Sequence, residues 1–269
     1  MSEGQQDVRQ AGARVTSRPS LRTTRWARIG AGLAIAAAIG VATSACSSKS
    51  ASSTAVVSST AAATTAAACS AYASVDAEPV GYHACGTAAR DVGIPTFIST
   101  VAEKTYTVTM QTNRGTIVFT ADGKAAPYTV YSFVYLAEKD YFNATKCHRL
   151  TTEGIFVLQC GDPTGTGSGG PGYEFQDENL TSLGTPVNSS VTYPAGEVAM
   201  ANAGPGTNGS QFFLVYKNTP LAPSYTPFGQ ITQGLNLIQQ VAAAGTNNAN
   251  NQGDGAPNDP VELEKVTVQ

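Results

Sequence analysis

The sequence predicts a mainly β domain in which many short strands and two helices form a closed barrel or a sandwich. Two kinds of pattern support this prediction: short strand-like runs separated by Gly-rich turns, and two segments with the apolar spacing of a helix. The strand-like runs cover residues 155–159, 197–201, 211–216 and 227–231. Closure of such a sheet would remove exposed strand edges.

The first elements are a hairpin and a helix. Residues 106–110 and 115–120 are rich in β-formers, and the residues between them, 112–115, have the composition of a hairpin turn. Pro127 then suits the first position of a helix that ends near residues 139–140. Its apolar residues recur at i, i+3, i+4 and i+7, which gives one buried face: Val130, Phe133, Val134 and Ala137.

The last elements are a second helix and a strand. The helix is expected at 234–243, where apolar residues cluster and Gly245 can terminate it. Residues 261–268 alternate between apolar and polar, as one half-buried strand does. We therefore place one domain at 104–269, about 165 residues, which is an ordinary single-domain size.

The first 45 residues have the pattern of an export signal. Arginines precede an apolar run of small residues at 29–45, which contains no charge. That run is shorter than the roughly 20 residues of a comfortable transmembrane helix. The positive flank would stay in the cytoplasm.

The apolar run is followed by Cys46, and Thr43-Ser44-Ala45-Cys46 resembles a bacterial lipoprotein signal. In such signals the Cys is lipidated and becomes the new N-terminus. Thr43 departs from the pattern, which prefers Leu, Val or Ile. Two alternatives stay open: an uncleaved signal anchor, and cleavage before Cys46 without a lipid. We expect the lipoprotein, attached at the outer face of the cytoplasmic membrane or elsewhere in the cell envelope.

Two further segments precede the domain. Residues 46–68 are rich in Ser, Thr and Ala and predict a disordered, flexible tether. Residues 69–103 lack a clear period, and we expect a partly ordered arm. From Cys46 onward there are 10 Lys and Arg against 17 Asp and Glu, a formal net charge of −7. This balance argues against a nucleic-acid partner and against a polybasic membrane patch.

The histidine content makes two other kinds of site improbable. The chain has only His83 and His148, whereas a His-based zinc site needs three or four converging ligands. Neither residue belongs to a recognisable nucleophile motif, which disfavours a Ser-His-acid triad. We therefore expect no metal.

Several motifs occur in order over residues 104–269. Residues 200–215, MANAGPGTNGSQFFLV, resemble the central signature of the cyclophilin family. Residues 147–150, CHRL, followed by 156–162, FVLQCGD, resemble its catalytic strand pair. Residues 167–170 and 175–179 resemble its Gly-rich loop and the segment that follows.

The resemblance implies an eight-stranded antiparallel barrel closed by two helices, with the active site on its outer face. It also implies a peptidyl-prolyl cis/trans isomerase that uses no cofactor. The partners would be proline-containing peptides and unfolded exported proteins, and we expect a monomer. Two alternatives stay open: a tethered module that binds Pro-containing segments or a partner protein without turnover, and a structural lipoprotein of the envelope.

The resemblance also implies roles for individual residues. A peptide bond resists rotation by roughly 18–20 kcal/mol because its nitrogen shares a lone pair with the carbonyl. A fixed cation beside the prolyl nitrogen would favour the twisted state, and the family assigns this role to Arg149. Gln159 would orient the substrate and the Arg, and Phe156 completes the catalytic set.

The remaining site residues would hold the peptide. Phe156, Val157, Phe213 and Leu221 match positions of the apolar seat for the proline ring. Ala201 and Asn202 match a strand that pairs with the substrate backbone. Gln211 lines the neighbouring groove. Tyr225 stands at the rim where relatives often have His, Val157 stands where they often have Met, and the turn between Arg149 and Gln159 is about two residues longer.

The cysteines follow from the same resemblance. If Cys46 is lipidated, four remain in an oxidising compartment. The family pairs the strands that carry Cys147 and Cys160, so these two could face each other and form a disulfide. Cys69 and Cys85 would then close the arm. The alternative is two buried thiols that behave as small apolar side chains.

Overall fold

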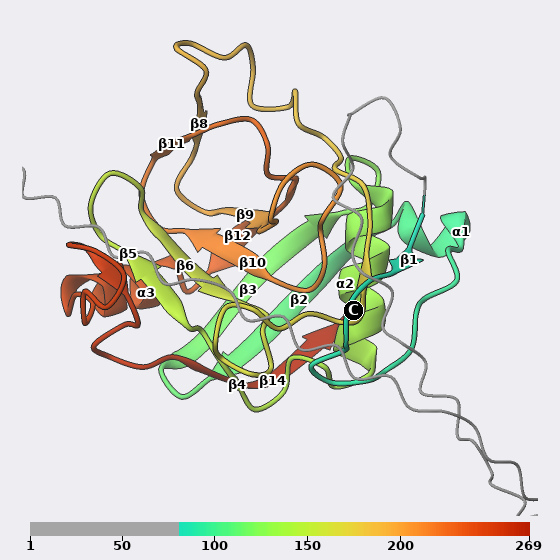
Figure 1. Ribbon diagram of the computed structural model, residues 1–269, viewed down its shortest axis with the longest axis horizontal. Coiled ribbons are helices and arrows are strands. Elements are labelled where there is room, and N and C mark those ends of the chain that lie inside the picture. The colour runs from blue at the N-terminus through green and yellow to red at the C-terminus, as the bar shows by residue number, and fades with distance from the viewer. Residues whose placement is uncertain (1–80) are drawn as a thin grey trace, which may run out of the picture. The chain divides into compact units, whose positions relative to one another are not determined.

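The computed structural model describes residues 81–269 (Figure 1). Its main element is an antiparallel sheet of ten strands. In spatial order they are β13 (Asp254–Gly255), β5 (Arg149–Thr151), β6 (Val157–Cys160), β10 (Phe212–Val215), β9 (Glu197–Met200), β12 (Pro227–Gln233), β3 (Gly115–Asp122), β2 (Thr105–Thr112), β14 (Glu262–Val268) and β4 (Thr145–Lys146).

Two small sheets and three helices complete the described part of the chain. One sheet pairs β1 (His83–Ala84) with β7 (Tyr173–Glu174), and the other pairs β8 (Val191–Tyr193) with β11 (Thr219–Leu221). The helices are α1 (Ser99–Ala102), α2 (Pro127–Glu138) and α3 (Leu235–Ala243). The mainly β prediction is confirmed. The main sheet has ten strands where eight were expected, and α1 adds a short helix to the two expected.

The predicted hairpin and the two predicted helices are all present. The register pairs Val108 with Phe119 and Met110 with Ile117, and these four side chains are buried. Alternation along β2 and β3 therefore turns one face of the hairpin toward the core. The apolar face of α2 covers this side of the curled sheet, and Phe133 lies among the aromatic rings of Phe119, Phe142, Phe212 and Phe228.

The N-terminus of α2 is capped from a distant part of the chain. Its own N-cap residue, Ala126, offers no side-chain acceptor. The carboxylate of Glu178 instead accepts hydrogen bonds from the backbone N–H groups of Tyr128 (3.1 Å) and Thr129 (2.8 Å). These are donors that a helix leaves unsatisfied in its first turn, where a negative charge is also favourable. The contact fixes the segment after β7 against α2.

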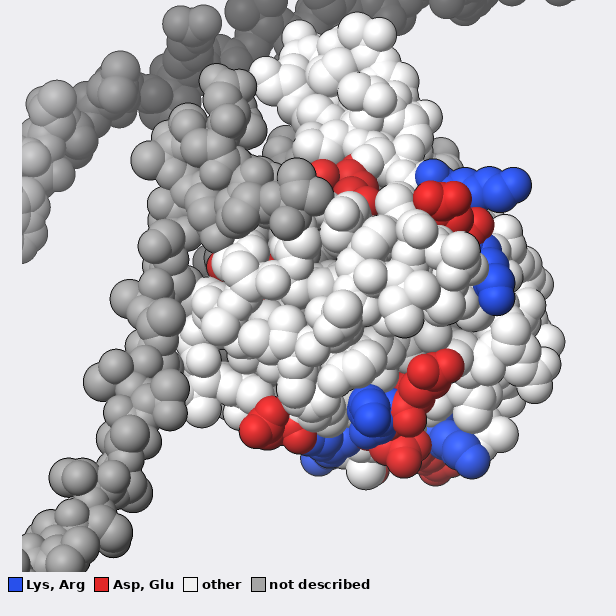
Figure 2. All heavy atoms as spheres, turned by 90° about the vertical axis from the view of Figure 1, so that its right-hand side faces the viewer, with Lys and Arg blue, Asp and Glu red and all other residues white. Residues whose placement is uncertain are grey.

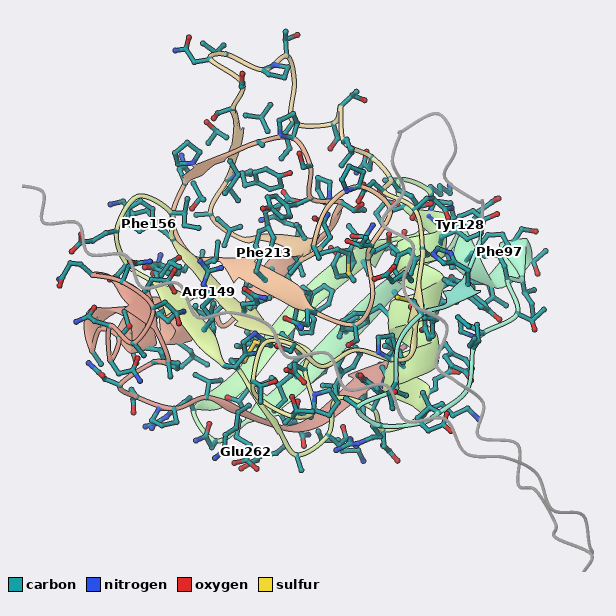
Figure 3. The ribbon with its side chains drawn as sticks, in the orientation of Figure 1. Phe97, Tyr128, Arg149, Phe156, Phe213 and Glu262 are labelled. Atoms are coloured by element: carbon teal, nitrogen blue, oxygen red, sulfur yellow. A yellow bond between two sulfur atoms is a disulfide. The ribbon has the colours of Figure 1, made fainter. Side chains whose placement is uncertain are left out.

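The described part of the arm, residues 81–103, packs against the domain. Its strand β1 pairs with β7, and Arg90 donates to the carbonyl oxygens of Asp140, Tyr141 and Asn143 just beyond α2. The ring of Phe97 stacks on that of Tyr128 at 4.0 Å (Figure 3). Figure 2 faces the side where α1 and α2 lie, and the charged side chains visible there, of both signs, lie mostly near its margin.

Candidate active site

Three strands place Arg149, Gln159 and Phe213 side by side. In the register of β5, β6 and β10, Gln159 is opposite Arg149 on one side and opposite Phe213 on the other. Their neighbours Leu150 and Leu158 are fully buried in the core, so this row faces the outside of the sheet. Arg149 Nη1 donates to Gln159 Oε1 at 3.3 Å. Figure 3 shows Arg149 and Phe213 in the same region of the molecule.

Gln159 is held in turn by Gln211. Gln159 Nε2 donates to Gln211 Oε1 at 2.8 Å. Gln211 Nε2 donates to the carbonyl oxygens of Gly167 and Gly169, both at 2.9 Å. This chain of hydrogen bonds fixes which end of each amide is the donor, and it leads from Arg149 to the Gly-rich loop.

Asp162 anchors that loop and was not singled out in the sequence. It has no exposed surface, and its carboxylate accepts backbone N–H bonds from Thr164, Thr166, Gly167 and Gly169. Burial alone would raise the pKa of Asp162, but the hydrogen bonds that it accepts lower the pKa to about 2. The residue therefore stays ionised and stiffens the loop that carries the Gln211 acceptors.

Asp254 is the second residue that the sequence did not reveal. Its carboxylate accepts two hydrogen bonds from the Arg149 guanidinium: from Nε to Oδ1 at 2.9 Å and from Nη2 to Oδ2 at 2.7 Å. The hydrogen bonds that Arg149 donates to Asp254 raise the pKa of Arg149, whereas burial lowers it. Asp254 lies 105 residues from Arg149 along the chain and belongs to the two-residue strand β13. No local pattern could have indicated this pair.

An apolar cluster lies beside this row. Its buried members are Val157, Val191, Tyr193, Ala199, Phe213 and Val215. Three predicted site residues, Ala201, Leu221 and Tyr225, pack on it and are partly buried. The ring of Tyr225 meets that of Phe213 edge-on, with centroids 5.6 Å apart. The structure thus brings four predicted apolar residues of the seat or its rim together: Val157, Phe213, Leu221 and Tyr225.

Phe156 does not join this cluster. It packs instead against the main core, with its ring 6.0 Å from that of Tyr216, and Lys217 Nζ lies 4.2 Å from the ring centroid. The structure thus places the ring of Phe156 beside Tyr216 and Lys217, and its role in the seat for the proline ring stays a prediction. Phe156 directly follows the longer turn after β5 and precedes the first paired residue of β6. The neighbouring Val157 provides the apolar contact from this strand.

A hollow of about 370 Å³ extends from Gln159 and Gln211 to the arm. Ala201 and Asn202 line it on one side, and Gly86 and Thr87 of the arm also line it. The backbone N–H of Ala201 donates to the carbonyl of Gln211, and the side-chain amide of Asn202 donates to the carbonyl of Ser224 at 2.7 Å. These two hydrogen bonds thus tie the segment Ala201-Asn202, which lines the hollow, to Gln211 and to Ser224.

A second hollow of about 420 Å³ lies on the other side of Arg149, where His148, Asn247 and Asn250 line it. Burial lowers the pKa of His148, although Asp162 acts in the opposite direction. Within residues 81–269, no group of three or more acidic, His or Cys side chains is placed to hold a metal ion. In the same range no helix has the length and apolarity needed to cross a membrane.

The structure contains the predicted disulfide between Cys147 and Cys160. These cysteines immediately precede His148-Arg149 and follow Gln159, so the bridge ties together the chain segments that carry the row. Cys85 is also disulfide-bonded. Cys69, its predicted partner, lies outside the described residues, as do Cys46, the apolar run 29–45 and the tether 46–68.

The part of the chain that forms this site is similar to known proteins. The profile of the family described as cyclophilin type peptidyl-prolyl cis-trans isomerase/CLD matches residues 107–268. The probable peptidyl-prolyl cis-trans isomerase B of Mycobacterium tuberculosis is 47% identical over 167 residues, which cover 60% of this chain and 54% of the relative. The protein of the same name from Mycobacterium leprae is 45% identical over 170 residues, covering 61% and 57%. The chain thus spans only about half the length of these relatives.

Two further comparisons cover nearly the whole of the other protein. Peptidyl-prolyl cis-trans isomerase A of Mycobacterium tuberculosis is 41% identical over 182 residues, which cover 61% of this chain and 92% of the relative. The crystal structure of a cyclophilin type isomerase from Cryptosporidium parvum is 28% identical with a TM-score of 0.51, covering 62% of this chain and 98% of that one. The chain therefore belongs to the cyclophilin family.

Proposed function

We propose that this protein is a peptidyl-prolyl cis/trans isomerase that acts on X–Pro bonds of peptides and unfolded proteins. One observation carries the proposal: the row Arg149–Gln159–Phe213 places a guanidinium, an amide and an apolar ring on one outer face of adjacent strands. Neighbouring strands are about 5 Å apart, so Arg149 and Phe213 are separated by roughly 10 Å, with Gln159 between them. A prolyl residue and its preceding amide fit this distance.

The reaction requires no bond to be broken. Rotation about the X–Pro bond is slow because conjugation is lost in the twisted state, where the prolyl nitrogen becomes a lone-pair acceptor. With the proline ring on Phe213, Val157 and Leu221, an N–H of Arg149 donates to that nitrogen. The donor is already oriented by its partners, so it stabilises the twisted state more than the planar one.

The peptide itself needs few further groups. The strand segment Ala201-Asn202 borders the hollow beside Gln211 and can align an extended backbone there. A solved cyclophilin type structure from Cryptosporidium parvum was obtained in the presence of the dipeptide Ala-Pro; it is 28% identical with a TM-score of 0.50. This likeness supports short proline-containing peptides as the first substrates to test.

The test is an exchange measurement by NMR on an X–Pro peptide with wild-type protein and with Arg149→Ala. We expect the variant to lose roughly 100-fold in catalysed rate, the usual effect of removing one preorganised donor. Arg114→Ala is the matched control, because Arg114 lies in the turn between β2 and β3, where it forms an ion pair with Asp259. Equal rates for wild type and Arg149→Ala would instead favour a module that binds Pro-containing segments without turnover.

We further propose that the protein is exported and works on exported proteins. The Arg-rich start, the apolar run 29–45 and Cys46 support a lipid anchor at the outer face of the membrane, with residues 46–68 as the tether. Mass spectrometry of the mature protein from the membrane fraction tests this. A lipidated Cys46 at the N-terminus is expected, and an unmodified or more distant N-terminus would refute the anchor. Native mass measurement of the same sample tests the monomer.

A further inference from the structure

The guanidinium of Arg149 has two partners of different kinds. Gln159 accepts one hydrogen bond, at 3.3 Å. Asp254 accepts two, at 2.9 and 2.7 Å, through both carboxylate oxygens. Paired, charge-assisted bonds of this kind are stronger and more directional than a single neutral one. Asp254 therefore determines the plane of the guanidinium more firmly than Gln159 does.

The number of donors shows what remains for a substrate. A guanidinium has five N–H groups, one on Nε and two on each Nη. Asp254 engages Nε and one N–H of Nη2, and Gln159 engages one N–H of Nη1. These contacts leave one N–H on Nη1 and one N–H on Nη2 available to donate to a substrate. The ion pair thus occupies Nε and leaves the free donors on the two terminal nitrogens, Nη1 and Nη2.

Asp254 is itself fixed in place. It pairs with Thr151 as part of β13, at the end of the main sheet next to β5. Asn250 Nδ2 donates to Asp254 Oδ1 at 3.0 Å, and the backbone N–H of Asn250 donates to the carbonyl of Asp254. The Asp254 side chain is 20% exposed, against 35% for Arg149. A residue held by its strand partner and by Asn250 can act as a rigid support for the longer Arg side chain.

We propose that Asp254 is a positioning residue of the active site, which orients Arg149 so that a free N–H of its terminal nitrogens faces the prolyl nitrogen. The proposal rests on the isomerase function proposed above. Without Asp254, Arg149 keeps its charge and Gln159, but its side chain gains rotational freedom that must be lost again in the twisted state. The loss should therefore appear in the rate of the bound peptide more than in peptide affinity.

The experiment compares Asp254→Ala, Asp254→Asn and Asp254→Glu with Asp259→Ala. The last variant is the matched control, because Asp259 lies in the same C-terminal segment as Asp254 but pairs with the exposed Arg114. Three quantities are measured for each protein: the exchange rate of an X–Pro peptide at saturation, the affinity for that peptide, and the ¹⁵N–¹H signal of Arg149 Nε. Arg149→Lys identifies that signal by removing it.

We expect Asp254→Ala to lower the saturated rate about tenfold, with affinity changed less than about threefold. The Arg149 Nε signal should shift and broaden, because its hydrogen then exchanges with water. Asp254→Glu should restore part of the saturated rate and of the Nε signal, since it keeps a carboxylate with two acceptor oxygens. Asp254→Asn should give values between those of the Glu and Ala variants. Asp259→Ala should leave both unchanged.

An unaltered Nε signal in Asp254→Ala, or an equal loss of rate in Asp259→Ala, overturns the proposal. If Asp254→Ala does not fold, Asp254→Asn, which has nearly the same shape, decides by the same two criteria. The Nε signal reports on Arg149 without any turnover. A wild-type protein that shows no isomerisation would therefore refute the proposed function, while the signal still decides whether Asp254 orients Arg149.

Discussion

Tyr193 holds the backbone of Tyr225 through a single hydroxyl group. The hydroxyl donates to the Tyr225 carbonyl at 2.7 Å and accepts from the Tyr225 N–H at 3.3 Å. Burial raises the pKa of Tyr193 to about 12, so the group keeps its proton at any physiological pH. Because the Tyr225 ring lies edge-on against Phe213, this contact sets the rim of the apolar cluster.

Tyr193→Phe should therefore loosen the rim. We expect the free energy of unfolding to fall by about 1–2 kcal/mol, since a carbonyl and an N–H lose their partner. The KM for an X–Pro peptide should rise several-fold with a smaller change in kcat. Tyr216→Phe is the control, because its buried hydroxyl also donates to a backbone carbonyl, that of Thr151, but away from Phe213. An equal rise of KM in both variants would contradict the expectation.

Asp162→Asn should destabilise the protein in a pH-dependent way. The folded pKa of Asp162, about 2, lies below the usual 3.8, so its stabilisation is present above pH 4 and is lost as the pH falls toward 2. A shift of this size corresponds to roughly 2–3 kcal/mol near neutral pH. Denaturant unfolding at several pH values measures the difference between the variant and the wild type.

The matched control for Asp162 is Asp91→Asn. Asp91 is exposed and accepts one backbone N–H, from Gly93. Its removal should change the free energy of unfolding by well under 1 kcal/mol. A difference between wild type and Asp162→Asn that stays constant down to pH 2 would show that the ionised carboxylate is not what holds the Gly-rich loop.

Local patterns in the sequence predicted those parts of the fold that local physics determines. The hairpin of β2 and β3 and the buried face of α2 follow from alternation and from helical spacing, which depend only on nearby residues. The row Arg149–Gln159–Phe213 could be predicted only through the family resemblance. The pairing of β6 with β10 joins Gln159 to Phe213, which are far apart in the chain.

Other parts of the site could not be predicted, because their partners are distant and their elements are short. Asp254 belongs to a two-residue strand, and the arm contributes the equally short β1. Such strands carry too few residues to show a period. For Phe156 the motif match predicts which residue matters, whereas the direction of its ring is seen only in the structure. That ring packs with Tyr216 and Lys217.

Glu197→Gln should stabilise the protein at high pH. Burial raises the pKa of Glu197 from 4.5 to about 7. A raised folded pKa means that the stability present below pH 4.5 is lost as the pH rises through 7. The neutral Gln avoids this loss, so above pH 7 the variant should unfold with a free energy higher by about 1–3 kcal/mol.

The pH dependence separates this effect from a general gain in packing. Wild type and Glu197→Gln should have nearly equal stability below pH 4.5, where Glu197 is protonated in both states. Glu264→Gln, at an exposed position of β14, serves as the control for the loss of a carboxylate, and its free energy of unfolding should stay within about 0.5 kcal/mol of the wild type. A stability difference that is the same at low and high pH would rule out ionisation of Glu197 as the cause.

The arm should influence how the peptide binds. Gly86 and Thr87 line the hollow of about 370 Å³ that also contains Gln211, Ala201 and Asn202. The arm is held there by backbone bonds from Cys85 to Gly172 and from Ala89 to Gly170, on either side of these two residues. A large side chain at position 87 would therefore project into space that a bound peptide occupies on the side of Gln211.

Thr87→Trp should raise the KM of long X–Pro peptides about tenfold or more and leave kcat nearly unchanged, because Arg149 and Phe213 are untouched. A dipeptide-sized substrate is too short to reach the arm and should be isomerised at the wild-type rate. Asp91→Trp, an exposed arm position that does not line the hollow, controls for a general effect of the bulky residue. If long and short substrates were affected equally, or if Asp91→Trp had the same effect, the arm would not form part of the peptide-binding surface.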